Sequence, residues 1–262
     1  MIKNKTGTRE WADHNKNIFH GCQNNCRYCY ARANALWFNR IDTTDEWKNM
    51  TLNKRSFNEK PRFYKGLNSR IMFPTSHDIF PEHMDDTIKY LRGWLGAGNC
   101  FLIVSKPRLE CIRRLCDDLK EFKDQITFRF TIGSSDDAVL SFWEPDAPCY
   151  MERMNSLIHA YQMGYKTSVS CEPYLDNKIA LMVEKILPLV TDTVWIGKMN
   201  DIKRRVNTQG WTRHDFVFLD RVKECQTDGF VTWLYNELKD NKKVRWKDTI
   251  KRVMGLPQEE IG

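Results

Sequence analysis

Short apolar segments recur along the chain, separated by longer segments in which apolar residues follow a helical period. A short apolar run bounded by polar residues is typical of a buried strand. Six runs fit this description, and we predict that each forms a strand: 17–19, 70–73, 101–104, 127–132, 167–170 and 193–196.

The segments between these runs have the periodicity of amphipathic helices. From Ile179 to Leu187, for example, apolar residues recur at i, i+3, i+4, i+7 and i+8, so that their side chains share one face. Strands that alternate with helices of roughly 10 to 15 residues indicate βαβ units and a parallel sheet. We expect the helices at 30–37, 83–96, 107–123, 151–163 and 176–187.

The number of strands limits the possible architectures. Six strands are too few for a closed eight-stranded barrel. The expected fold is α/β, a partial (β/α)6 barrel of the TIM type, and a doubly wound sheet is the alternative. In both folds the active groups lie in the loops that follow the carboxyl ends of the strands.

The pattern changes near residue 200. We expect residues 1–200 to form the barrel and residues 201–262 to form a basic, helical C-terminal extension packed on it, with helices around 215–225 and 229–240. Between Lys239 and Arg252, seven Lys and Arg residues stand against two Asp residues. This run fits either a solvated helix face or a surface that contacts phosphates.

The composition is sufficient for one sizeable core. Of 262 residues, 41% are hydrophobic and 29% charged, and the formal net charge is +7. These values exclude disordered, collagen-like and membrane-embedded chains. The N-terminus lacks the apolar region of a secretory signal, and no apolar run approaches the roughly 20 residues of a membrane span. We expect a soluble, cytoplasmic protein, for which a moderate positive charge alone identifies no partner.

Three of the nine cysteines are clustered. Cys22, Cys26 and Cys29 form a C-x3-C-x2-C motif, and thiolates are soft ligands suited to iron–sulfur clusters or zinc. Six others are scattered and are expected to be small buried hydrophobic residues. An odd number of cysteines in a cytoplasmic chain argues against a disulfide framework.

The cysteine motif is compatible with two kinds of metal site. A structural zinc site needs a fourth ligand, which His20 or His14 could supply. A [4Fe-4S] cluster held by three cysteines instead leaves one iron open to an exogenous ligand. The second cysteine pair of a zinc ribbon is missing, and the motif follows a predicted strand, where barrels carry their chemistry.

With Tyr28 directly before its third cysteine, the motif resembles the signature of radical S-adenosylmethionine enzymes. The resemblance implies that the three cysteines ligate a [4Fe-4S] cluster whose fourth iron binds S-adenosylmethionine. It also implies reductive cleavage of this cofactor and a 5′-deoxyadenosyl radical that abstracts hydrogen from a substrate. The protein would orient the cofactor and exclude water.

Further segments resemble one branch of these enzymes. Residues 70–78, 131–137 and 143–148 are similar to segments of the branch that contains spore photoproduct lyase and phage-associated, uncharacterised proteins. The resemblance covers roughly residues 15–200. It implies that the first 200 residues carry the cluster.

The resemblance implies cofactor contacts in the loops after the strands. Relatives receive the methionyl amine on a glycine-rich segment after the second strand, whereas this chain offers the hydroxyls of Thr75 and Ser76, with Asp78 as a further candidate. Tyr28 is expected to cover the cluster and to offer backbone groups to the adenine. Helix capping is the alternative role for Ser76 and Asp78.

Other candidates follow later strands. Ser134 and Ser135 could bond the ribose or the carboxylate of the cofactor, or they could simply form a turn. Lys106 could pair with the cofactor carboxylate or with a substrate phosphate, and capping of the next helix is its alternative role. Glu172 could hold ribose hydroxyls or substrate. Asn200 follows the sixth strand and is a further pocket candidate.

The resemblance to spore photoproduct lyase has one gap. That enzyme is expected to return a hydrogen atom from a cysteine after its second strand, but residues 73–78 contain no cysteine. This absence argues against photoproduct repair. Cys171, at the end of a strand, is the candidate catalytic hydrogen donor, and a buried structural thiol is the alternative.

The sequence therefore predicts an enzyme with a [4Fe-4S] cluster and S-adenosylmethionine as cofactors. Its expected partners are a reductant such as flavodoxin or ferredoxin and, as a candidate substrate, nucleic acid or a nucleotide. The alternative is a non-catalytic nucleic-acid-binding protein stapled by zinc on His20 and the three cysteines. An electron-carrying iron–sulfur protein is disfavoured, because a carrier needs no cofactor-sized barrel mouth.

Overall fold

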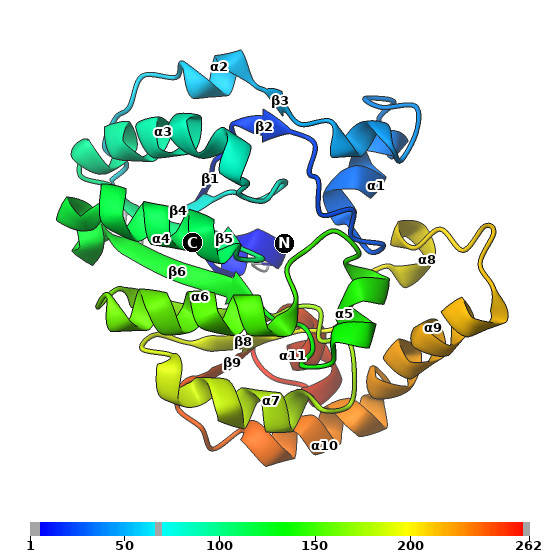
Figure 1. Cartoon of the computed structure of the whole chain (residues 1–262). Helices are drawn as coiled ribbons and strands as arrows, with labels where there is room; N and C mark the ends of the chain where they lie inside the picture. The colour runs from blue at the N-terminus through cyan, green and yellow to red at the C-terminus, as the bar shows by residue number, and fades with distance from the viewer. Residues whose placement is uncertain (1–5, 66–69, 259–262) are drawn as a thin grey trace.

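A computed structural model describes residues 6–65 and 70–258. Its main sheet has seven strands, all paired in parallel, in the order β1-β4-β5-β6-β7-β8-β9. The sheet curls into an open half-barrel (Figure 1). Its strands are β1 (His14–Asn15), β4 (Arg70–Phe73), β5 (Cys100–Ser105), β6 (Ile126–Thr131), β7 (Lys166–Cys171), β8 (Val194–Ile196) and β9 (Val244–Trp246).

A second, two-stranded antiparallel sheet pairs β2 (Phe19–His20) with β3 (Thr51–Leu52). The α-helices are α1 (Tyr30–Trp37), α2 (Lys54–Phe57), α3 (Met84–Gly96), α4 (Leu109–Asp118), α5 (Asp137–Trp143), α6 (Tyr150–Gln162), α7 (Ile179–Ile186), α8 (Ile202–Arg205), α9 (Arg213–Cys225), α10 (Asp228–Leu238) and α11 (Asp248–Met254). Five 3-10 segments complete the described residues: η1 (Gly7–Glu10), η2 (Glu46–Lys48), η3 (Pro81–His83), η4 (Lys120–Gln125) and η5 (Leu187–Leu189).

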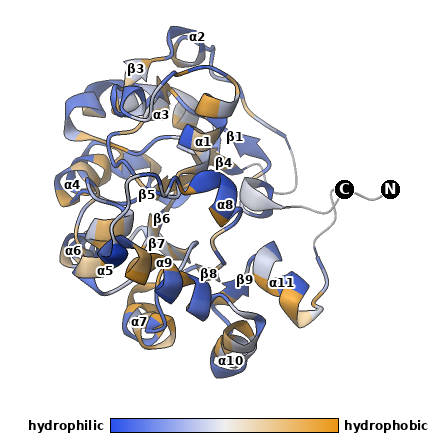
Figure 2. Ribbon diagram, turned by 90° about the vertical axis from the view of Figure 1, so that its right-hand side faces the viewer, coloured by the Kyte–Doolittle hydropathy of each residue, from blue (hydrophilic) through white to orange (hydrophobic). Residues whose placement is uncertain are grey.

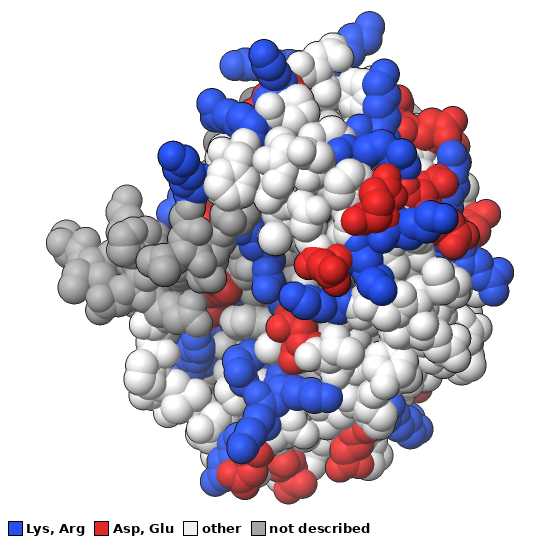
Figure 3. Space-filling view, turned by 90° about the vertical axis from the view of Figure 1, so that its left-hand side faces the viewer, with Lys and Arg blue, Asp and Glu red and all other residues white. Residues whose placement is uncertain are grey.

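Helices α3, α4, α6 and α7 follow one another along the outer face of the sheet (Figure 1). This arrangement results from the parallel pairing, since each strand must be reached through a crossover. The helices carry apolar and polar residues on different sides (Figure 2). The face of the molecule opposite α8 shows basic and acidic side chains close to one another (Figure 3).

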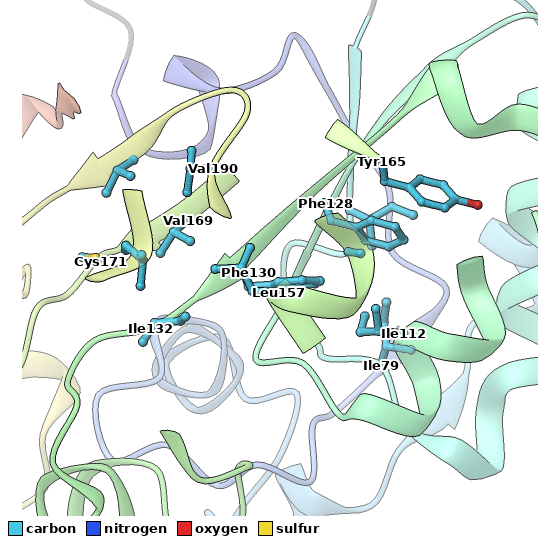
Figure 4. Packing of buried hydrophobic residues seen from close by; sticks show 14 of the residues in the cluster. Ile79, Ile112, Phe128, Phe130, Ile132, Leu157, Tyr165, Val169, Cys171 and Val190 are labelled. Carbon is cyan, nitrogen blue, oxygen red and sulfur yellow. The ribbon is translucent and has the colours of Figure 1, made fainter. Parts of the chain in front are cut away.

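The two faces of the sheet differ in character. On β6, Phe128 and Phe130 belong to the apolar core under the helices, whereas Arg129 and Thr131 point to the concave side. Successive side chains of a strand point to opposite faces, so one strand serves both surfaces. The concave side is therefore lined with polar groups, and the apolar residues between sheet and helices form the core (Figure 4).

Five of the six predicted strands are confirmed as β4 to β8, but the first lies elsewhere. The strand that joins the main sheet is His14–Asn15, not 17–19. The side-chain oxygen of Asn17 accepts hydrogen bonds from the backbone of Thr75 at 2.7 Å and Ser76 at 2.9 Å. These bonds to the next loop end the ladder, and the chain then turns away to pair with β3.

The C-terminal segment contains a strand that the sequence analysis did not predict. Strand β9 pairs in parallel with β8 and forms one edge of the main sheet. The basic run also differs from a continuous exposed face: Lys247 is fully buried, and Lys243 Nζ donates to the carbonyl of Val190 at 2.7 Å. Within the described residues, no helix is both long and apolar enough to cross a bilayer.

Candidate active site

A cavity of about 1060 Å³ opens at the carboxyl end of the half-barrel. Residues after β2, β4, β5, β7 and β8 line it, together with the N-terminal residues 6–9. This is the edge of the sheet where α/β proteins place their chemistry. The candidates that reach it are Cys22, Cys26, Tyr28, Cys29, Thr75, Ser76, Asp78, Lys106, Glu172 and Asn200.

The three motif cysteines lie in the loop between β2 and α1, and all three line the cavity. Gly21 makes the loop possible. Its φ is +88°, and an added Cβ would lie 2.7 Å from the carbonyl oxygen of Trp47, which accepts the Cys22 N–H at the same distance. Cys29 caps α1, because its Sγ accepts a hydrogen bond from the Arg32 N–H.

The donor set fits a cluster better than a single metal ion. Among the described residues, no three His, Cys, Asp or Glu side chains are grouped to hold one ion. A four-iron cluster does not require this grouping, because each thiolate can bind a different iron. Burial raises the pKa of Cys22, and that of Cys26 to about 12, so a bound cationic cluster would favour the thiolates that the buried site alone disfavours.

The other potential ligands near the cysteines are already engaged. Both ring nitrogens of His77 contact backbone groups, and Asp78 accepts hydrogen bonds from Asn24, Ile79, Ser105 and Lys106. His20, the fourth ligand of the zinc alternative, is exposed on β2 and is not part of the cavity lining. Of these described side chains, the three thiols therefore remain the best placed to hold a metal group.

A buried charged network supports Tyr28 and Lys106. The Tyr28 hydroxyl donates to Glu144, whose carboxylate lies 2.5 Å from Arg153 Nη2 and 3.9 Å from Lys106 Nζ. Burial opposes ionisation of Glu144, but Arg153 and Lys106 hold its pKa below the usual value. Lys106 thus lies beside a carboxylate at the cavity wall, with 15% of its side chain exposed.

The loop after β4 presents hydroxyl groups to the cavity. Thr75 Oγ1 accepts a hydrogen bond from Asn17 Nδ2 at 2.6 Å, which leaves its own hydrogen free to donate. Tyr30, at the start of α1, donates its hydroxyl to the Thr75 carbonyl. Ser76 follows Thr75 and also lines the cavity. This loop is therefore held by Asn17, just after β1, and by Tyr30 of α1, with its polar groups at the cavity mouth.

The structure does not bring Ser134 and Ser135 into the cavity lining. The Ser134 hydroxyl bonds Asp176 and accepts from the Asp136 N–H at 2.9 Å, so it stabilises the turn before α5. This is the turn role that the sequence analysis kept as its alternative. A cofactor contact at Ser134 would have to replace these two bonds.

Cys171 also lies away from the cavity. Ser170 lines the cavity, and the next side chain of a strand points to the opposite face. Cys171 is fully buried in the apolar core near Val169 and Ile132 (Figure 4). Burial raises the pKa of its thiol and so keeps it protonated, but its place in the core separates the S–H from the cavity.

Glu172 is linked to both ends of the chain. Its carboxylate lies 3.5 Å from Lys247 Nζ, and the same ammonium lies 2.6 Å from Glu10. Lys247 also donates to the carbonyl of Gly7 at 2.6 Å. Burial raises the pKa of Glu172 above the usual range, and Lys247 opposes this shift.

Sequence reasoning missed several residues of the site. Tyr30 and Arg205 line the cavity, and the Arg205 guanidinium lies 5.8 Å from the Tyr30 ring. Asn24 lies within the cysteine motif and Glu144 within the segment 143–148, but the sequence analysis assigned neither residue a role. Their polar character inside those segments was the available signal, whereas nothing local marks Arg205 as a neighbour of α1.

No protein-family model matches the chain. A stretch of 179 residues, 65% of the chain, is 27% identical to uncharacterized protein ORF301 of Acidianus two-tailed virus and spans 59% of that protein. The chain therefore covers less than two thirds of this relative's length.

Solved structures of spore photoproduct lyase are similar in fold. Its complex with dinucleoside spore photoproduct aligns with a TM-score of 0.53 at 13% identity, over 92% of this chain and 65% of that one. A cysteine-to-serine mutant gives a TM-score of 0.55 at 13% identity, over 94% and 79%. A double mutant with bound AdoMet and the dinucleoside aligns over 92% and 64%, with 13% identity and a TM-score of 0.50. The chain has the α/β half-barrel fold of spore photoproduct lyase.

Proposed function

We propose that this protein is a radical S-adenosylmethionine enzyme. The observation that carries the proposal is the arrangement of Cys22, Cys26 and Cys29, which line one cavity at the carboxyl end of a parallel half-barrel. The cavity of about 1060 Å³ is at the upper end of the range for ligand sites, which leaves room for a cofactor and a substrate group.

The three cysteines would hold a [4Fe-4S] cluster. When bound, the cluster would pass an electron, from a reductant such as flavodoxin or ferredoxin, to S-adenosylmethionine and so produce a 5′-deoxyadenosyl radical that abstracts hydrogen from the substrate. The chain's own residues would orient the cofactor: Thr75 and Ser76 toward its amine, and Lys106 toward its carboxylate. Glu172 would hold ribose hydroxyls or substrate.

Cys171 receives no catalytic part in this proposal. Its side chain would have to leave the apolar core to reach the cavity. Ser134 also receives no part, because its hydroxyl is engaged in hydrogen bonds within its own turn and to Asp176. A hydrogen atom returned to a product would have to come from another donor.

The proposal is tested by comparing two cysteine variants after anaerobic reconstitution with iron and sulfide. The wild-type protein is expected to bind about four irons, as one [4Fe-4S] cluster does, and to release 5′-deoxyadenosine after reduction with dithionite. Cys26→Ala should lose both properties, because it removes one cluster ligand. Cys100→Ala removes an exposed thiol outside the cavity and should keep both.

Iron content, visible absorbance and chromatography of 5′-deoxyadenosine provide the measurements. A Cys26→Ala protein with unchanged iron and product would overturn the ligand assignment. A colourless wild-type protein with one tightly held zinc would replace the proposal with the zinc-stapled alternative.

A further inference from the structure

Helices α1 and α8 lie side by side (Figures 1 and 2). Residues of both helices line the cavity. Tyr30, Asn34 and Trp37 are spaced i, i+4 and i+7, so they share one face of α1. Tyr30 lines the cavity, and Trp37 lies about 10 Å farther along the helix axis. This face therefore leads from the outside of the molecule to the cavity mouth.

Each aromatic ring along this path has a guanidinium beside it. Arg205 lies 5.8 Å from the Tyr30 ring, and Arg204 lies 5.8 Å from the Trp37 ring while it donates to Asn34. Just past the end of α1, Arg40 lies 5.5 Å from the Phe38 ring. Aromatic and cationic groups therefore alternate along the path.

The rings are exposed to an unusual degree. Trp37 is 70% exposed, Phe38 61% and Tyr30 38%. Exposed aromatic residues gathered beside a cavity are typical of a binding surface. We call the set Tyr30, Asn34, Trp37, Phe38, Arg40, Arg204 and Arg205 the aromatic rim.

The charge of the aromatic rim complements an anion. Helix α8 has the sequence Ile-Lys-Arg-Arg, and Lys203 and Arg204 are exposed. Of the acidic residues that follow α1, Asp45 pairs with Lys48, and Glu46 accepts hydrogen bonds from the backbone of Thr43. The aromatic rim itself therefore carries three arginines and no carboxylate, while Asp42 and Asp201 are exposed in the segments beside it. The face opposite α8 shows basic and acidic side chains close to one another (Figure 3).

We infer that the aromatic rim binds a single-stranded nucleic acid and leads one nucleotide to the cavity. Bases stack on exposed aromatic rings, and cations contact the phosphates between them. A duplex fits this surface less well, because its bases are already stacked on one another. The inference rests on the proposed function and adds a substrate class to it.

The test measures binding of short fluorescein-labelled oligo(dT) and oligo(U) by fluorescence anisotropy, with a duplex of equal length alongside. We expect both single strands to bind more tightly than the duplex. The tighter-binding of the two oligonucleotides shows whether the preferred ligand is DNA or RNA. Trp37→Ala and Phe38→Ala should each raise the Kd by at least about fivefold, because one stacked base is lost. Trp233→Ala removes an exposed tryptophan from α10 and should leave the Kd unchanged.

A second variant tests the electrostatic part. Arg204→Gln should weaken binding and reduce the slope of log Kd against log salt by about one, as expected for one lost phosphate contact. Lys239→Gln, in the C-terminal basic run, should leave the slope unchanged.

Several outcomes would overturn the inference: no oligonucleotide binding by the wild-type protein, equal Kd values for Trp37→Ala and wild type, or equal loss in Trp233→Ala. Tighter binding of polyglutamate than of oligo(dT) would assign the rim to an acidic protein instead. Release of 5′-deoxyadenosine by the wild-type protein is measured separately without oligonucleotide. If no 5′-deoxyadenosine is released, the proposed function is wrong. If 5′-deoxyadenosine is released but no oligonucleotide binds, only the inference that the aromatic rim binds nucleic acid is wrong.

Discussion

The imidazole of His77 is held between two backbone groups at the cavity wall. Its Nε2 accepts a hydrogen bond from the Ile18 N–H at 3.3 Å, so Nδ1 carries the proton and donates to the Asp78 carbonyl at 2.9 Å. A second proton on Nε2 would face the Ile18 N–H. Burial and this arrangement keep the ring neutral, and the pKa of His77 is lowered to about 4.

His77 should make the protein less stable in mild acid. Below its ordinary pKa of 6.5 the unfolded chain binds a proton that the folded protein does not bind until about pH 4. Stability therefore falls as the pH drops through this window, by about 2 kcal/mol between roughly pH 7 and pH 5. His77→Gln should flatten this decline in urea unfolding experiments, whereas His214→Gln, at an exposed position, should not. An unchanged decline in His77→Gln would contradict this origin.

At the scale of elements, one buried ammonium joins the two ends of the chain. Lys247 lies between β9 and α11, and it contacts Glu10 of η1, Glu172 after β7 and the carbonyl of Gly7. Its Nζ is also 4.4 Å from the Trp11 ring. Because no part of Lys247 is exposed, its charge depends on these partners.

Lys247→Met is expected to lower the free energy of unfolding by about 3 to 5 kcal/mol, since it breaks a buried ion pair. Glu10 would keep only Lys251, at 4.0 Å, and the partly buried Glu172 would lose the cation beside it. Adding Glu10→Gln should recover part of the loss, because one of those charges is then removed. Urea unfolding measures both variants. Lys242→Met changes an exposed lysine of the same segment and should stay within about 0.5 kcal/mol of wild type. A loss in Lys247→Met as small as that of Lys242→Met would refute the charge argument.

At the scale of the whole molecule, the C-terminal segment completes the half-barrel rather than lying on it. Strand β9 covers the open side of β8, and Lys247 fills the interior beside Glu172. Helix α10 contacts α7 on the outer face. We therefore expect the segments on the two sides of residue 200 to unfold together.

A chain that ends at residue 200 is expected to aggregate or to unfold without a cooperative transition. It would expose the edge of β8 and leave Glu10 and Glu172 without Lys247. A chain that ends at residue 258 keeps these contacts and serves as the control. Soluble yield and thermal unfolding followed by circular dichroism decide the question. A sharp transition in the shorter chain would establish residues 1–200 as a separate domain.

The sequence predicted those parts of the fold and site that local patterns encode. Helix α1 is found at the predicted residues 30–37, because helical periodicity is a local signal. The predicted strand segments 70–73, 101–104, 127–132, 167–170 and 193–196 match β4 to β8 because short runs rich in apolar and β-branched residues between helices suit a buried parallel sheet. The short β9 carries only two buried side chains, which is too weak a signal by itself.

Local sequence patterns could not predict which side chains far apart in the sequence contact one another. Asn17, just after β1, accepts hydrogen bonds from the backbone of the loop after β4, and Arg205 lies beside Tyr30 only because α8 packs on α1. The spacing of the cysteines and the α/β order follow from the sequence alone, because spacing and periodicity act over a few residues. Which polar groups face the cavity, and which lie buried like Cys171, was decided by the tertiary structure, because strand register and curvature determine the face that each side chain occupies.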